Sequence, residues 1–161
     1  MTVRPVVTNQ GEGRAIWHGD ALWQFKATSE DTDGRFFLAE LRAAEGWASP
    51  VHLHTKEDET FIVLEGELWV QIAGEDHKVP AGAVAVMPRG IPHAYRVVSP
   101  TARFLALGVP GGFECWFIET GEPAGELTLP PPATEQPDYA AYVASLSQYG
   151  VQFIAPPPLP A

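Results

Sequence analysis

The segment Gly46–Gly66 reads GWASPVHLHTKEDETFIVLEG, and residues 82–93 read GAVAVMPRGIPH. In the first segment, His52 and His54 are separated by one residue, so on a strand both imidazoles point to the same face of the sheet. Glu59 follows five residues later, after a polar stretch in which a turn can reverse the chain. We therefore expect Glu59 to return on a neighbouring strand beside the two histidines.

The second segment adds a third imidazole. A stretch rich in Pro and Gly enters another short run at His93. Imidazoles with one carboxylate suit a divalent transition metal ion such as Fe, Mn, Co, Ni or Zn, whereas the lack of further carboxylates argues against calcium. Taken singly, a His-x-His pair is typical of surface or core histidines. The acidic residues 57–59, taken singly, are typical of a turn exposed to solvent. The combination predicts one metal site, formed by His52, His54, Glu59 and His93.

The two segments lie in a series of short runs rich in β-branched and aromatic residues, with Gly, Pro and Asp between them. This pattern is typical of an antiparallel sandwich or barrel. The runs predict strands at 21–27, 36–42, 51–54, 60–64, 68–72, 83–87, 93–98, 104–109 and 113–119.

The C-terminal part follows a different pattern. After an irregular connector at 121–136, apolar residues recur with helical spacing from Tyr139 to Leu146. Pro137 suits the first turn of a helix and Gly150 the position just past its end. We expect one C-terminal helix at about 138–149, laid against the barrel, and an extended tail at 156–158.

Length and composition set further bounds. The 161 residues fit a single domain, with a core at about 35–120 and a connector and helix at 121–161. A net charge of −10 without a Lys/Arg cluster argues against nucleic-acid binding. The sequence has no apolar run long enough for a membrane span and no pattern of a secretory signal, and Cys115 has no second cysteine with which to form a disulfide. We therefore expect a cytoplasmic protein that does not enter a membrane. Cys115 is expected to be a buried structural thiol.

The two segments resemble the two motifs of the cupin superfamily. The first fits G-x5-H-x-H-x4-E-x6-G at every fixed position from Gly46 to Gly66, and the second fits G-x5-P-x-G-x2-H from Gly82 to His93. The spacing between Gly66 and Gly82 is usual for small microbial cupins. The second motif usually ends in Asn, where this chain has Val97, a position that is not a metal ligand in the family.

The stretches 109–114 (VPGGFE) and 149–153 (YGVQF) are similar to single-domain bacterial cupins grouped with the quercetin 2,3-dioxygenases. The resemblance implies an all-β, jelly-roll-like double-stranded β-helix with one C-terminal helix. In quercetinase-type enzymes the metal binds the substrate enolate, the carboxylate matching Glu59 is metal ligand and general base, and dioxygen opens the ring with loss of carbon monoxide. We therefore expect an oxidoreductase, a metal-dependent dioxygenase of a flavonol-like or other aromatic enol, with Glu59 as its catalytic residue.

Two other functions stay open at this point. One is a metal-dependent cupin without oxygen chemistry, such as an isomerase or an aromatic polyketide cyclase. The other is a non-catalytic small-molecule-binding cupin. Regulators of that kind usually carry a helix-turn-helix, for which the sequence offers no second helix and no basic region.

The expected partners are an aromatic small molecule, O2 and a second copy of the chain. If the metal ligands point into the barrel, Phe61 and Tyr95 also point inward, because each lies two residues from a ligand on the same strand. The candidates for substrate contacts, each also explained as barrel core, are Phe61, Tyr95, Trp47, Trp69, Met87 and Phe104. His18 and His77 have no partner in the sequence pattern. Small cupins commonly dimerise by pairing sheets, and the apolar segments 60–64 and 15–25 favour a homodimer.

Overall fold

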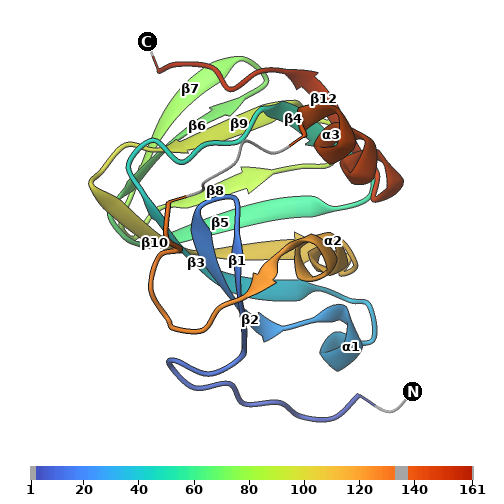
Figure 1. The fold of residues 1–161 in the computed structure, drawn as a ribbon. Coiled ribbons are helices and arrows are strands. Elements are labelled where there is room, and N and C mark those ends of the chain that lie inside the picture. The colour runs from blue at the N-terminus through green and yellow to red at the C-terminus, as the bar shows by residue number, and fades with distance from the viewer. Residues whose placement is uncertain (1–2, 133–137, 161) are drawn as a thin grey trace.

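Two antiparallel sheets face each other in the structure, a computed structural model that describes residues 3–132 and 138–160 (Figure 1). The larger sheet has the strand order β11 (Glu122–Pro123), β1 (Arg14–His18), β2 (Ala21–Ala27), β3 (Phe37–Ala44), β10 (Thr101–Val109), β5 (Asp58–Glu65) and β8 (Val84–Met87). The smaller sheet has the order β12 (Val151–Ala155), β4 (Val51–His54), β9 (His93–Val97), β6 (Glu67–Ile72) and β7 (Glu75–Pro80). Together they form the predicted double-stranded β-helix.

Alternating exposure along the strands shows which side chains fill the space between the sheets. On β5, Phe61 and Val63 are buried while Ile62 and Leu64 are half-buried on the outer face. The metal-binding candidate Glu59 has the same phase as Phe61 and Val63, so it points inward. The expected inward phase of β5 is therefore confirmed.

The prediction of a strand at 113–119 is wrong, because these residues form the helix α2 (Glu114–Thr120). A strand would place Trp116 on the face opposite to Phe113 and Phe117. In a helix the spacings of three and four residues bring all three aromatic side chains to one side, and all three are buried. Burial of this aromatic cluster therefore outweighs the β propensity of the single residues.

Several elements lie outside the predicted set. The strands β1, β7, β11 and β12 and the short helix α1 (Ser29–Thr32) were not expected. The residues of β7, EDHKVP, are mostly exposed, so they lack the apolar signal of a half-buried strand. β12 forms because it pairs with β4, placing Phe153 opposite His52. Long-range pairing of this kind leaves little trace in a local pattern.

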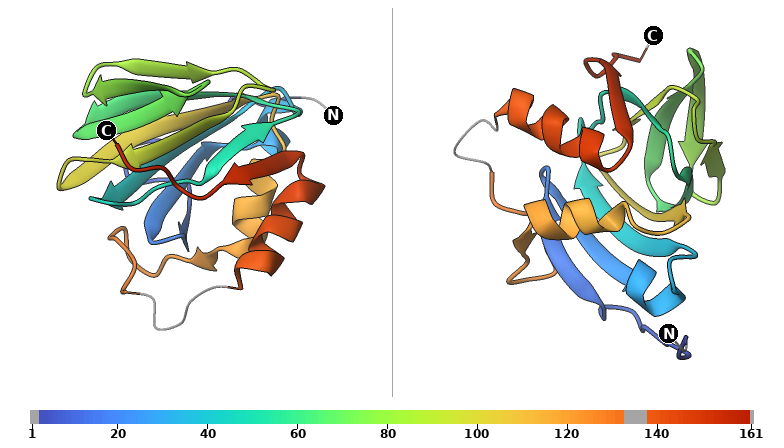
Figure 2. Two further views of the ribbon diagram at one scale, coloured as in Figure 1. Left: turned by 90° about the horizontal axis from the view of Figure 1, so that it is seen from above. Right: turned by 90° about the vertical axis from the view of Figure 1, so that its right-hand side faces the viewer.

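The predicted C-terminal helix is confirmed as α3 (Tyr139–Gln148). The Asp138 side chain caps it by accepting a hydrogen bond from the Ala141 N–H at 3.1 Å, while Pro137 falls outside the described residues. α3 lies beside α2 in both views of Figure 2. The Trp116 indole Nε1 donates to Ser145 Oγ at 3.0 Å, which joins the two helices. None of the helices that the structure describes is long and apolar enough to cross a membrane.

Candidate metal centre and its cavity

The four predicted ligands converge between the two sheets. His52 and His54 come from β4, His93 from β9 and Glu59 from β5. His52 and His93 are direct cross-strand partners in the smaller sheet, and Glu59 reaches them from the larger one. One nitrogen or oxygen atom of each side chain lies within 4.8 Å of the others, and all four residues are buried.

Backbone carbonyls set the orientation of two imidazoles. His52 Nδ1 donates to the Pro50 carbonyl at 2.8 Å, and His93 Nδ1 donates to the Ile91 carbonyl at 2.9 Å. A carbonyl oxygen only accepts, so each Nδ1 carries the proton of the neutral ring and Nε2 keeps its lone pair. A lone pair directed at the shared centre is what a metal ion requires of an imidazole.

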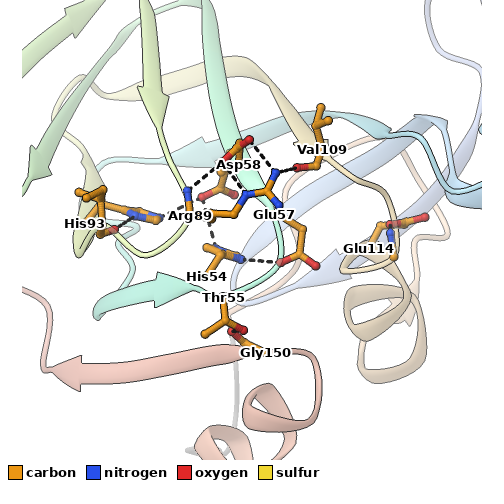
Figure 3. A network of polar contacts seen from close by, with 12 residues as sticks. His54, Thr55, Glu57, Asp58, Arg89, His93, Val109, Glu114 and Gly150 are labelled. Atoms are coloured by element: carbon orange, nitrogen blue, oxygen red, sulfur yellow. Dashed lines mark hydrogen bonds and ion pairs between the residues drawn. The ribbon is translucent and has the colours of Figure 1, made fainter.

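The third imidazole, His54, is oriented by a carboxylate. Its Nδ1 lies 3.4 Å from Glu57 Oε2, in the network drawn in Figure 3. Its Nε2 is buried without a hydrogen-bond partner among the described residues and lies 3.7 Å from Glu59 Oε2. A buried polar atom without a partner costs free energy unless something else satisfies it. Three imidazole nitrogens and one carboxylate around this atom fit a divalent transition metal ion.

The charges in the centre also favour a cation. Burial by itself would raise the pKa of the Glu59 carboxyl group, but the contact of its Oε2 with His93 Nε2 at 3.3 Å and the nearby imidazoles lower that pKa to about 2. Burial lowers the pKa of His52 to about 3, helped by repulsion from His93. At neutral pH the centre therefore offers an ionised carboxylate and a neutral His52, the protonation states that metal ligands need.

A cavity of about 100 Å³ opens beside this centre. His52, His54 and Glu59 contribute to its wall. Two of the predicted substrate-contact residues, Trp47 and Tyr95, line it as well. The other four, Phe61, Trp69, Met87 and Phe104, are buried in the barrel and are not among the lining residues.

Much of the cavity wall comes from residues that the sequence patterns did not single out. His18 stands at the end of β1, Phe113, Trp116 and Phe117 belong to α2 or precede it, and Tyr142 and Leu146 belong to α3. The spacing of the three aromatic residues near α2 is a signal from which a second helical wall, beside the predicted C-terminal helix, could have been recognised. The convergence of β1, α2 and α3 depends on tertiary packing.

Comparisons with known proteins agree with this architecture. Residues 39–108 match the family model described as "Cupin domain". The chain is 31% identical over 119 residues to quercetin 2,3-dioxygenase from Bacillus subtilis (strain 168), which covers 74% of this chain and 35% of that relative. It is 29% identical over 137 residues to quercetin 2,3-dioxygenase from Aspergillus japonicus, covering 80% of this chain and 39% of the relative. The chain thus spans between a third and two fifths of the length of these curated relatives.

A solved structure shows the same fold. A predicted oxalate decarboxylase from Thermotoga maritima superimposes with a TM-score of 0.61 at 19% sequence identity, over 65% of this chain and 99% of that one. At this identity the likeness concerns the fold alone.

Proposed function

We propose that this chain, which carries a cupin domain and resembles quercetin 2,3-dioxygenases, is a metal-dependent dioxygenase of an aromatic enol. The observation that carries the proposal is the buried centre of three histidines and Glu59 at the wall of an aromatic cavity. Such a combination of a few convergent polar groups and apolar walls is the usual form of a small-molecule site.

The residues of this chain supply positioning, proton transfer and exclusion of water. A divalent metal ion bound by His52, His54, Glu59 and His93 would act as a Lewis acid that lowers the pKa of an enol hydroxyl group. Glu59 lines the cavity and is ionised, so its carboxylate can accept the proton that the enol releases. The aromatic walls keep water away, and the low dielectric strengthens electrostatic stabilisation of the enolate.

Oxygen uptake tests the proposal. Protein reconstituted separately with Ni, Co, Fe(II), Mn and Zn is supplied with flavonols and with smaller 3-hydroxychromones. We expect oxygen consumption with carbon monoxide release in at least one metal form, and its loss in Glu59→Ala. If every form binds its ion but none consumes oxygen, the dioxygenase assignment fails and a non-oxidative isomerase or cyclase becomes the better assignment.

We further propose that the protein forms a homodimer through the outer face of the larger sheet. Val84 and Val86 on β8 are each 56% exposed there. Ile62 and Leu105 on the two strands next in the sheet are half-buried. Two ion pairs frame this apolar face, Asp58–Arg89 at one end of β5 and Arg103–Glu65 at the other. Since each pair carries both signs, its charges balance, and a second copy related by a two-fold axis can cover the face without meeting a net charge there.

A further inference from the structure

His18 lines the same cavity as the metal ligands His52, His54 and Glu59, and two series of neighbouring aromatic side chains connect it to the metal centre. Along one wall, ring centroids follow one another from His54 to Phe113 at 4.8 Å, to Trp116 at 5.9 Å and to His18 at 4.7 Å. All of these residues line the same cavity.

The second wall runs through other elements to the same two ends. From His52, ring centroids lead to Tyr95 at 6.2 Å, then to Trp47 at 5.4 Å and to Trp23 at 6.4 Å. Trp23 lies 6.4 Å from His18, which closes the circuit. The cavity wall is therefore largely aromatic, and aromatic rings stand between the His18 imidazole and those of His52 and His54 along both series.

The hydrogen bonds of Thr120 determine which nitrogen of His18 carries a proton. The Thr120 hydroxyl group donates to the Trp116 carbonyl at 2.6 Å. It has only one proton, so at 3.0 Å from His18 Nε2 it accepts, and Nε2–H is the donor. In the neutral ring Nδ1 then carries the lone pair, and no described residue donates to it.

The electrostatic environment keeps this ring neutral. Burial lowers the pKa of His18 to about 4, so the imidazole is uncharged at neutral pH. Its Nδ1 is an acceptor, and His18 lines a cavity whose wall is otherwise made largely of aromatic rings. An acceptor in such a place selects for a ligand that brings a donor, since an unmatched polar group would lose its hydrogen bond to water.

We propose that His18 is a substrate-binding residue whose Nδ1 accepts a hydrogen bond from a hydroxyl group at the end of the aromatic substrate opposite to the enol. The inference rests on the proposed function for the position of the enol, and it adds the substrate class. The cavity of about 100 Å³ is small beside the ~300–1,000 Å³ typical of ligand pockets. The substrate is therefore a flat enol of one or two fused rings with a distal phenolic hydroxyl group.

Binding to the zinc-loaded protein tests this without relying on oxygen chemistry. The probes are 3-hydroxychromone and 3,7-dihydroxychromone, which differ by one hydroxyl group at the far end of the fused rings. Quenching of tryptophan fluorescence reports binding, because Trp23, Trp47 and Trp116 line the cavity. We expect the dihydroxy compound to bind about 3- to 10-fold more tightly, the range of one hydrogen bond.

Variants separate His18 from general effects on the fold. His18→Phe keeps an aromatic ring but has no acceptor, so the two probes should bind equally. Thr120→Val keeps the imidazole but no longer fixes its proton on Nε2, so the preference should shrink. His77→Phe alters an exposed histidine on β7 and should leave the preference unchanged.

The outcomes divide cleanly. Equal affinities in the wild-type protein, a preference that survives in His18→Phe, or no binding of either probe would overturn the inference. If the preference disappears in His18→Phe but no metal form consumes oxygen, His18 keeps its role and only the dioxygenase assignment falls.

Discussion

Glu57 Oε2 lies 3.4 Å from His54 Nδ1, and both side chains are almost completely buried. The other two histidines of the metal centre are held by backbone carbonyls, so His54 alone is oriented by an ionisable side chain. Burial opposes a charge on His54, but the hydrogen bond that its Nδ1–H donates to Glu57 and the charge of Glu59 raise the pKa of His54 above the usual value. A carboxylate in this position makes the ring more basic toward a metal ion.

Removing this carboxylate should weaken metal binding. We expect Glu57→Ala to lower the affinity for zinc by about 10- to 100-fold, the usual effect of losing a partner that orients a ligating histidine. Competition titration with a chromophoric chelator measures the change. Glu75→Ala, which alters an exposed carboxylate on β7, serves as the control. An unchanged affinity in Glu57→Ala would show that His54 needs no such partner.

Metal loading should stabilise the folded protein. The buried Nε2 of His54, which has no hydrogen-bond partner among the described residues, gains one when the ion binds, and the ion has no preformed site in the unfolded chain. At a free metal concentration of about 100 times Kd, the free energy of unfolding should rise by about 2.7 kcal/mol. Urea denaturation with and without EDTA measures this. His93→Ala should abolish the difference, whereas His77→Ala should retain it.

His18 should make the stability of the metal-free protein depend on pH. Its pKa is about 4 in the folded state and near 6.5 when exposed, because burial disfavours the imidazolium. Between these values the unfolded chain binds more protons than the folded one, so the free energy of unfolding decreases as pH falls from 6.5 toward 4. Above pH 6.5 the imidazole is neutral in both states, so this destabilisation is absent.

Comparison with His18→Gln isolates that contribution from the other histidines. Urea denaturation at pH 7, 5.5 and 4.5 should show that the free energy of unfolding decreases less steeply with falling pH in the variant. The difference in slope is at most that of one bound proton, about 1.4 kcal/mol per pH unit. His77→Gln should follow the wild-type curve. Parallel curves for wild type and His18→Gln would mean that His18 titrates alike in both states.

The proposed dimer should depend on the exposed valines of β8. Val84→Lys combined with Val86→Lys places two charges on each copy where apolar surfaces would meet, so we expect a monomer. Light scattering at micromolar concentration measures the mass. Circular dichroism and zinc affinity should stay unchanged, because both side chains point away from the barrel interior. A wild-type protein that is already monomeric would remove the proposal.

Several features of the protein follow from the sequence alone. The alternation of His52 and His54 indicates one shared face, because side chains of a strand repeat every two residues. The spacing to Glu59 indicates a return strand, and the apolar residues from Tyr139 to Leu146 indicate a helix. These are local relations between neighbours in the chain, which the backbone geometry fixes directly.

Tertiary structure decided the rest. His93 comes into register with His52 only through pairing of β4 with β9. His18 faces the cavity only because α2 folds as a helix, whose Trp116 and Thr120 then contact its ring. Contacts between residues so far apart depend on which surfaces are buried together, and burial is a property of the whole packed chain rather than of any local period.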